Sequence, residues 1–216
     1  HWPVVRVARE YQELPDMVRI GRMRIRVPSQ WYGDFAAALG SSYIGENRLH
    51  ELIADYGEEV ISEFVDEWIE YGRRRMVSEI RSLPEGTWEA ESHVDPLPGV
   101  TPEGLTIRVK MTVDHSEEKI IIDLRDNPDQ VPGGINLPIA SSIASPAQGL
   151  FACLDYTLPH NTGCFERIEY LLREGCICGI PNFPAGTSVS TSYITDRLTS
   201  LTMALLAEID PTRGGA

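Results

Sequence analysis

Two polar loops carry most of the side chains that could do chemistry in this chain. The first lies in KIIIDLRDNPDQVPGGINLP (119–138), where four apolar residues around Asp123 predict a buried strand. Asn127-Pro128 and Pro132-Gly133-Gly134 then predict a long ordered loop rather than a hairpin. Because rigid strands often hold binding groups on such loops, its polar residues are candidates for a site. They are Asp123, Arg125, Asp126, Asp129, Gln130 and Asn136.

The second loop, PHNTGCF (159–165), places His160 and Asn161 ahead of Gly163. A histidine and an asparagine on a tight loop could orient a substrate carbonyl or a water molecule. Asn161 and Gly163 could equally do no more than build the turn, and from the residues alone we favour that structural interpretation.

Asp123 also has a purely structural explanation. A carboxylate in a buried strand needs a partner, and Arg125 or Arg108 could supply one. An ion pair of that sort is usually structural.

Other sequence patterns with known chemistry are missing or weak. Gly133-Gly134 lacks the Lys-Ser/Thr and the setting of a phosphate-binding loop, and GTSVS (186–190) lacks the second glycine of a nucleophile elbow. Cys176-x-Cys178, with Cys164 and His160 upstream, could be imagined as a metal site. Their spacing is not that of a zinc knuckle, so buried thiols are favoured and no metal site is predicted here.

The composition is that of an ordinary globular protein, with 216 residues, 42% hydrophobic and 24% charged. The net charge of −13 argues against nucleic-acid binding, because phosphate contacts need clustered Lys and Arg. No apolar run approaches the roughly 20 residues needed to cross a bilayer, and no signal peptide is expected at the start. Four cysteines are too few for a disulfide framework at this size, so a reducing, cytoplasmic location is expected.

The N-terminal part is predicted to begin with strands. In RMRIRVP (22–28) arginines alternate with apolar residues, and this period of two is typical of a half-buried strand ended by Pro28. Ser29 is then predicted to cap a helix.

Two helices are predicted next. The first, over 30–56, has apolar residues spaced by three and four, is weakened or interrupted at Gly40 and Gly45, and ends at Gly57. The second, over 57–81, has a continuous apolar stripe. Its first half is acidic and its last turns are basic, which complements the helix dipole.

The rest of the chain predicts a sheet with helices. Strands are predicted over 87–94, 105–113 and 119–124, a helix over 142–155 that starts near Pro146, a strand over 165–172, strand and loop over 175–184, and a helix over 192–208. The last helix turns five residues inward, namely Ile194, Leu198, Leu201, Leu205 and Leu206. The final DPTRGGA looks like a linker or a cut end.

The predicted fold class is α+β, with an N-terminal helical hairpin packed with a largely antiparallel mixed sheet and C-terminal helices. Residues 1–86 would hold the first strands and the amphipathic helical hairpin. Residues 87–216 would hold the sheet-rich part, both loop motifs and the final helix, and the two parts would form one continuous region.

Three stretches in this order, DLRDNPDQVPGGINLPIA, PHNTGCFERIEYLL and GCICGIPNFPAGTSVSTSYITDRL, resemble the hydantoinase B/oxoprolinase family. That family includes the alpha-type subunits of ketone carboxylases. The helical stretch GDFAAALGSSYIGENRLHELIADYG is similar to it as well, so the likeness covers nearly the whole chain. The residues that fit the family's loop positions are Asp123, Asn136, Asn161, Gly163, Cys164 and Pro181.

The resemblance implies a mechanism shared between subunits. A partner subunit or domain of the hydantoinase A type would use ATP and Mg²⁺ to phosphorylate a carbonyl oxygen. The B-type part would then hydrolyse the activated lactam or carboxylate the activated enolate. With the two loops, this gives Asn136, His160 and Asn161 as candidate catalytic residues, and Asp123, Arg125, Gly163 and Cys164 as candidate substrate-binding residues.

The family resemblance also implies a divalent metal, in a His- and Asp-containing motif upstream of WPVVRV. A glycine-rich region is expected after Ala216. We therefore expect an interior piece of a longer B-type subunit that lacks these metal ligands and is inactive when isolated. Three functions stay open: an ATP-dependent cyclic-amide hydrolase, an ATP-dependent ketone carboxylase, and a non-catalytic assembly segment of such a complex.

Overall fold

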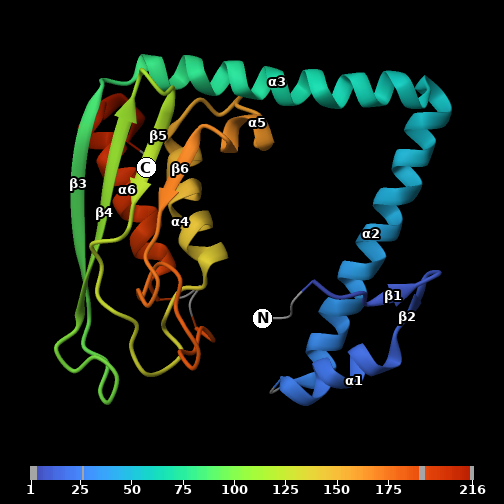
Figure 1. The fold of residues 1–216 in the computed structure, drawn as a ribbon, viewed down its shortest axis with the longest axis horizontal. Helices are drawn as coiled ribbons and strands as arrows, with labels where there is room; N and C mark the ends of the chain where they lie inside the picture. Colours follow the sequence, from blue (N-terminus) through green and yellow to red (C-terminus); the bar gives the residue numbers. More distant parts are fainter. Residues whose placement is uncertain (1–3, 26, 190–192, 215–216) are drawn as a thin grey trace. The chain divides into compact units, whose positions relative to one another are not determined.

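The computed structural model describes residues 4–25, 27–189 and 193–214. By its internal contacts the chain forms two compact units, one that ends at Val65 and one that begins at Asp66 (Figure 1). Both units contain helices and strands, so the predicted α+β class is confirmed. The division at residue 86 stays a prediction about domains, since the internal contacts divide the chain within the long helix α3. In the described part of the chain, no helix combines the length and the apolar character that a membrane span requires.

The first unit opens with a short antiparallel pair of strands, β1 (Ala8–Arg9) and β2 (Gln12–Glu13). Helix α1 (Pro15–Arg24) follows, so the strand predicted over 22–28 is wrong. Pro15 stands at the helix start, where its missing N–H costs nothing. A β-carbon on Gly21 would lie 2.0 Å from the Trp31 ring, so this glycine lets α1 approach the following helix closely.

That helix, α2, runs unbroken over Pro28–Tyr56. Its N-cap is Val27, so the predicted cap at Ser29 is wrong. Gly40 and Gly45 lie inside the helix without interrupting it, which corrects the second expectation about this segment. Gly57 ends the helix with a φ of 88°, as predicted.

Helix α3 (Glu58–Ser82) is the predicted second helix, and its two halves differ in burial. Only Gly72, Met76 and Ile80 are buried, all in the C-terminal half, where Met76 and Ile80 join the core of the second unit. The apolar residues of the first half remain largely exposed. The helix therefore anchors in the second unit through its last turns.

The second unit contains a four-stranded sheet in the order β3-β4-β5-β6. The three predicted strands are confirmed as β3 (Gly86–Val94), β4 (Leu105–Asp114) and β5 (Lys119–Asp123), which pair antiparallel in that order. The last strand, β6 (Ile168–Leu171), pairs parallel to β5. Alternate residues of β4 are buried, because one face of the sheet forms the core and the other faces solvent.

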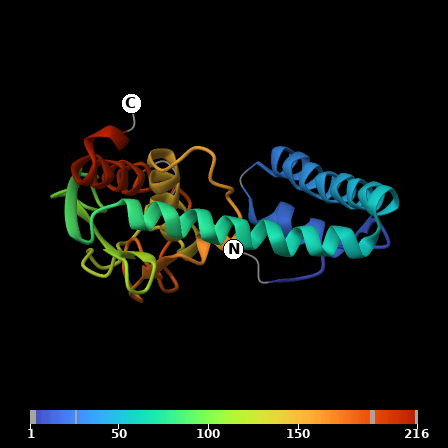
Figure 2. The same cartoon turned by 90° about the horizontal axis from the view of Figure 1, so that it is seen from above.

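Two helices, α4 (Ile139–Cys153) and α6 (Thr195–Ile209), cover the buried face of the sheet (Figures 1 and 2). A β-carbon on Gly149 would lie 2.6 Å from the backbone oxygen of Thr199, so α4 and α6 approach each other closely there. The five inward residues predicted for the last helix are all buried.

Several predicted boundaries in this unit are wrong. Helix α4 begins at Ile139 and contains Pro146 in its interior. Phe165 belongs to a short helix, α5 (Thr162–Phe165), and the strand begins only at Ile168. Over 175–184 there are isolated bridges instead of a strand.

The C-terminal end differs from the predictions as well. The last helix starts at Thr195, and Ser192, its predicted first residue, lies outside the described residues. The segment after it forms a short 3₁₀ helix, η2 (Pro211–Arg213), rather than a loose linker. Arg213 donates to Glu79 at 2.7 Å, which ties this segment to α3.

Candidate functional site

The carboxylate of Asp123 ends β5 on the polar face of the sheet, in register with Lys110 of β4. Its oxygens accept hydrogen bonds from Nε and Nη2 of Arg125 at 2.9 Å and 2.7 Å. Oδ1 also accepts from the backbone N–H of Arg125 at 3.0 Å. The Arg125 side chain is the main reason that the pKa of Asp123 lies below its usual value. Of the two predicted partners, Arg125 is therefore the one that pairs with Asp123.

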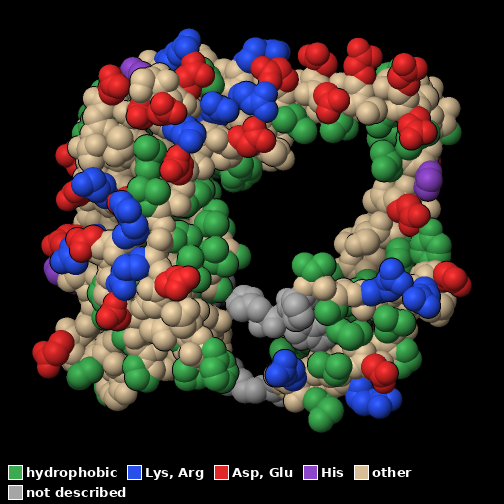
Figure 3. Space-filling model, in the orientation of Figure 1, with side chains coloured by type: hydrophobic (Ala, Val, Ile, Leu, Met, Phe, Trp, Pro, Cys, Tyr) green, Lys and Arg blue, Asp and Glu red, His purple; other side chains and the backbone are tan. Residues whose placement is uncertain are grey.

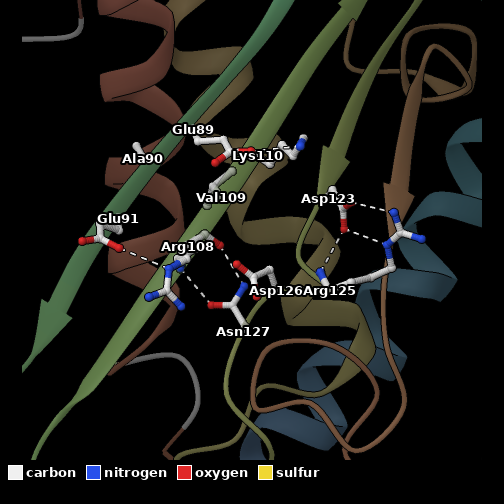
Figure 4. A pocket seen from close by; sticks show the side chains of 10 residues that line it. All are labelled: Glu89, Ala90, Glu91, Arg108, Val109, Lys110, Asp123, Arg125, Asp126 and Asn127. Carbon is white, nitrogen blue, oxygen red and sulfur yellow. Dashed lines mark hydrogen bonds and ion pairs between the residues drawn. The ribbon is translucent and has the colours of Figure 1, made fainter.

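This pair lines a polar pocket of about 740 Å³ over β3, β4 and the loop after β5 (Figure 4). Two further ion pairs lie beside it. Arg108 Nε contacts Glu91 Oε2 at 3.1 Å, and Lys110 Nζ contacts Glu89 Oε1 at 2.9 Å. Among the lining residues that the structure describes, each basic side chain thus holds an acidic one. A surface that alternates donors and acceptors suits a small polar ligand carrying both kinds of group.

Asn127 fixes the loop to the sheet, a role that the sequence did not reveal. Its Oδ1 accepts from the backbone N–H of Arg108 at 2.8 Å, and its Nδ2 donates to the backbone oxygens of Arg108 and Leu124 at 2.8 Å and 3.0 Å. The side chain therefore continues the hydrogen bonding of β4 beyond the end of β5. The sequence predicted an ordered loop here but not this contact, because the partner strand lies 19 residues earlier.

Arg173 holds the same loop from the other side. Its guanidinium donates to the backbone oxygens of Arg125 and Asn127 at 3.1 Å and 2.7 Å, and to Asp129 Oδ1 at 2.7 Å. Gln130 adds a link, since its Oε1 accepts from the backbone N–H of residue 182 at 2.6 Å. Nothing local in the sequence marks Arg173, whose partners are 44 to 48 residues away.

Asn136 is fully buried, and its amide bonds backbone groups from two loops. Oδ1 accepts from Val131 N at 2.8 Å, and Nδ2 donates to the oxygens of Val131, Gly133 and Gly186 at 2.9 Å, 3.2 Å and 2.9 Å. Both polar atoms of the amide are thus engaged within the protein. This geometry makes Asn136 a residue that positions the loop, and its catalytic role stays a prediction.

In the second loop, Asn161 caps α5 and holds it against α3. Oδ1 of Asn161 accepts from the backbone N–H of Cys164 at 3.3 Å, and Nδ2 donates to the backbone oxygen of Trp68 at 2.7 Å. The Cys164 thiol donates to the backbone oxygen of Gly72 at 3.2 Å. The Asn-x-Gly-Cys motif is therefore docked on one turn of α3.

Two glycines permit this close packing. A β-carbon on Gly163 would lie 1.9 Å from the backbone oxygen of Ile69, and one on Gly72 would lie 2.1 Å from Asn161 Oδ1. Burial raises the pKa of the Cys164 thiol, which keeps it protonated. His160 differs from these residues, because its imidazole is exposed and its ring centre lies 4.4 Å from that of Phe151.

The predicted site residues thus fall into two sets. Asp123, Arg125 and Asn136 lie on β5 and the connection from it to α4, whereas His160, Asn161, Gly163 and Cys164 lie on the segment docked to α3. Within the described residues, each set has its own neighbours and its own hydrogen bonds. A single site formed by both loops stays a prediction.

The described residues do not offer a donor set for a metal, since no group of three or more His, Cys, Asp or Glu side chains among them is placed to hold an ion. Cys176 and Cys178 are buried free thiols. A hydrogen bond from Cys178 lowers the pKa of Cys176. The described residues therefore do not provide the ligands for the divalent metal that the resemblance implies.

Comparisons with known proteins give a consistent result. A family model described as Hydantoinase B/oxoprolinase matches residues 1–216. A protein of Pseudomonas sp. strain NS671, named provisionally as the B-type subunit of a D-/L-hydantoinase, is 29% identical over 198 residues, or 87% of this chain and 33% of that protein. The chain therefore spans about a third of the length of that relative.

Two solved structures have the same fold. The ATP-dependent caprolactamase of Pseudomonas jessenii superposes with a TM-score of 0.84 at 21% identity, over 98% of this chain and 36% of that one. A nucleotide-free acetone carboxylase superposes with a TM-score of 0.81 at 15% identity, over 97% of this chain and 29% of that one.

Proposed function

The chain belongs to the hydantoinase B/oxoprolinase family, and on that premise we propose that it forms part of the B-type subunit of an ATP-dependent hydrolase that opens cyclic amides such as hydantoins or 5-oxoproline. The observation that carries this proposal is the family match over residues 1–216. In such a reaction one water adds to the carbonyl carbon activated by O-phosphorylation, the C–N bond breaks, and the ring nitrogen takes up a proton. A second water then hydrolyses the resulting acyl phosphate to a carboxylate and inorganic phosphate.

The Asp123–Arg125 pair offers the two groups that a ring amide needs. A lactam or hydantoin presents an N–H donor beside a C=O acceptor, held in a fixed arrangement by the ring. The Asp123 carboxylate would accept from the N–H, and the Arg125 guanidinium would donate to the carbonyl oxygen. When the ligand binds, hydrogen bonds between Asp123 and Arg125 would be replaced by hydrogen bonds from each side chain to the ligand. Arg125 has the freedom to do so, because its side chain is 55% exposed.

The contacts of the catalytic candidates suggest two different roles, proton transfer and positioning of the loops. His160 would serve as the proton-transferring group, because its imidazole is exposed and histidine is the side chain that most often transfers protons in enzymes. Asn136 and Asn161 would position the two loops, and Gly163 and Cys164 would dock the second loop on α3. Whether His160 reaches the ring bound by Asp123 in the assembled enzyme is tested by the variants below.

A partner subunit of the hydantoinase A type would supply ATP and Mg²⁺ and phosphorylate the carbonyl oxygen, which makes that carbon a better electrophile. A divalent metal, if the complex contains one, would be held by residues outside this chain. The four free cysteines support a reducing compartment such as the cytoplasm.

One alternative has an observation of its own. The fold match to an acetone carboxylase, at a TM-score of 0.81, supports the alpha-type subunit of a ketone carboxylase. Bicarbonate separates the two reactions. Turnover that requires a ketone and bicarbonate would replace the hydrolase proposal, whereas ATP-dependent turnover of a lactam without bicarbonate supports it.

The test uses the full-length subunit that contains this chain, reconstituted with its partner subunit. Asp123→Asn, Arg125→Met and His160→Gln should each lower kcat/KM for ring opening at least tenfold, about 1.4 kcal/mol. Asp114→Asn, at the end of β4, is the matched control and should stay near the native rate. If all three variants keep native activity in an assembled complex, the chain is a non-catalytic assembly segment.

A further inference from the structure

The side chains that line the polar pocket over β3, β4 and the loop after β5 carry more negative than positive charge. Four acids and three bases line it, namely Glu89, Glu91, Asp123, Asp126, Arg108, Lys110 and Arg125. Figure 3 shows basic and acidic side chains interspersed over these strands. At neutral pH the lining therefore has one excess negative charge. A ligand that enters the pocket meets a surface that disfavours a further anion.

The three bases of the pocket already have acidic partners. Lys110 Nζ lies 2.9 Å from Glu89 Oε1, and this hydrogen bond is the main reason that the pKa of Lys110 lies above its usual value. Arg108 and Arg125 each have an acidic partner as well. A carboxylate on a ligand would have to displace an acid from one of these pairs to gain a cation of its own. The pocket therefore offers a ligand carboxylate little net attraction.

Asp126 differs from the other three acids of the lining. Among the residues that the structure describes, no basic side chain forms an ion pair with it, whereas the other three acids each hold a base. Its side chain is exposed and lines the pocket together with Asp123 and Arg125 (Figure 4). The excess negative charge of the pocket thus belongs to this carboxylate, which is available to a ligand.

The backbone at Asp126 is held on both sides. Before it, the backbone N–H of Arg125 donates to Asp123 Oδ1 at 3.0 Å. After it, the side chain of Asn127 exchanges two hydrogen bonds of 2.8 Å with the backbone of β4. The Cα atoms of Asp126 and Arg125 are about 3.8 Å apart, as in any pair of consecutive residues. The Asp126 side chain therefore extends from a fixed point beside the pair that would hold the ring amide.

We propose that this pocket selects ring amides that are uncharged or carry an ammonium group and rejects those that carry a carboxylate, with Asp126 as the specificity-determining residue. The inference rests on the proposed function, since it takes the ring amide to be held by Asp123 and Arg125. A substituent on the bound ring then comes within reach of Asp126. An ammonium group gains an ion pair there, whereas a carboxylate faces an unpaired like charge, which is a common means of excluding the wrong ligand. Hydantoins are thus favoured over 5-oxoproline.

The experiment compares three lactams that share one five-membered ring. 2-Pyrrolidinone is uncharged, 5-oxoproline adds a carboxylate, and 5-(aminomethyl)-2-pyrrolidinone adds an ammonium group at the same ring carbon. Ligand-observed NMR titration at pH 7 measures the dissociation constant of each for the full-length enzyme that contains this chain, without ATP, so that no ring opens. The uncharged lactam should bind at least tenfold more tightly than 5-oxoproline, and the aminomethyl lactam should bind most tightly.

Three variants assign the selection to one side chain. Asp126→Asn should remove the advantage of the ammonium group and bring the other two affinities closer by about fivefold, the effect of one charge at about 4 Å in water. Asp126→Glu keeps the charge and should keep the native order of affinities. Glu103→Gln is the matched control, because Glu103 is an exposed acid that does not line the pocket, and it should bind all three lactams as the native protein does.

Four results would overturn the proposal. They are equal or tighter binding of 5-oxoproline than of 2-pyrrolidinone, the native order of affinities in Asp126→Asn, no binding of any of the three lactams, and an equal effect of Glu103→Gln. The last result would attribute the selection to the net charge of the whole protein.

Ring opening with ATP is assayed separately, so that the two proposals can fail independently. An enzyme that binds the lactams in the expected order, loses that order in Asp126→Asn and opens no ring refutes the proposed function alone. An enzyme that opens 5-oxoproline with a kcat/KM equal to or above that for 2-pyrrolidinone supports the hydrolase and refutes the selection by charge.

Discussion

The side-chain nitrogen of Asn161 donates a hydrogen bond to the backbone oxygen of Trp68 at 2.7 Å, across 93 residues of sequence. The acceptor lies inside α3, and the donor opens the short helix α5. One side chain therefore sets the distance between the second loop and α3. The adjoining contacts of Gly163 with Ile69 and of Cys164 with Gly72 lie on the same turn.

Replacing Asn161 by Ala should lower the free energy of unfolding by about 1–3 kcal/mol, because the cap of α5 and the bond to Trp68 are both lost. Urea denaturation of the purified subunit measures this change. His160→Gln alters the neighbouring side chain and should change stability by less than about 0.5 kcal/mol. Native stability of the Asn161 variant with a loss of kcat would instead indicate that Asn161 contacts the substrate.

Gly163→Ala should destabilise the protein by about 1–3 kcal/mol, because the new methyl group would meet the Ile69 backbone oxygen. Gly40→Ala is the matched control. A β-carbon there meets nothing within 4 Å, and alanine is the better helix former by about 1 kcal/mol. Thermal melting should therefore move in opposite directions for the two variants. A stable Gly163 variant would show that α3 and the loop can separate at little cost.

Stability should depend on pH through Asp123. The pKa of this carboxyl is lowered in the folded protein, mainly by Arg125, so its ionised form stabilises the fold. That contribution is fully present above the unfolded value of about 3.9 and disappears as the pH falls through the lower folded value. The difference in unfolding free energy between the native protein and Asp123→Asn should therefore shrink below pH about 4. Arg125→Met removes the main cause of the lowered Asp123 pKa. It should therefore reduce the dependence of the unfolding free energy on pH in the same range.

Asn127→Ala should cost about 1–3 kcal/mol, because the Asn127 side chain is buried and the backbone N–H of Arg108 would lose its partner. Asn47→Ala, on the exposed surface of α2, should change stability by less than about 0.5 kcal/mol. Chemical denaturation measures both. An equal effect of the two substitutions would mean that water replaces the Asn127 side chain without loss.

The antiparallel strands are predictable from the sequence because a half-buried strand leaves a period of two. In β4 the buried residues Ile107, Val109 and Met111 alternate with Arg108 and Lys110. The same signal misleads over 22–28. That alternation spans few residues, and its first three, 22–24, instead continue α1, whose buried residues Val18 and Gly21 are spaced by three.

A glycine in the sequence is a weak guide to where a helix ends, unless the backbone there needs a positive φ. Gly57 has a positive φ and ends α2 as predicted. Gly40 and Gly45 cost only about 1 kcal/mol each, which a helix of 29 residues tolerates. Propensity alone therefore predicts interruptions that the helix does not have.

The sequence predicts which residues are candidates for the site, but it does not predict how their side chains are arranged in space. The Asp123–Arg125 pair is visible because its members are two residues apart. The roles of Asn161 and Arg173 depend on partners 93 and 44 to 48 residues away, and no local pattern encodes such distances. Long-range contacts of this kind become visible only in three dimensions.

The parallel pairing of β5 with β6 has a consequence for the order in which the chain acquires its structure. All the candidate residues except Asp123 lie on the crossover between these strands, and Lys119 and Glu169, which flank it, meet across 50 residues of sequence. Closing so long a segment is slow compared with forming the hairpins of β3, β4 and β5. A chain that has folded only the hairpins of β3, β4 and β5 thus has the strands that line the pocket, but not yet the ordered loop after β5. The polar groups of the candidate site are therefore the last to take up their arrangement.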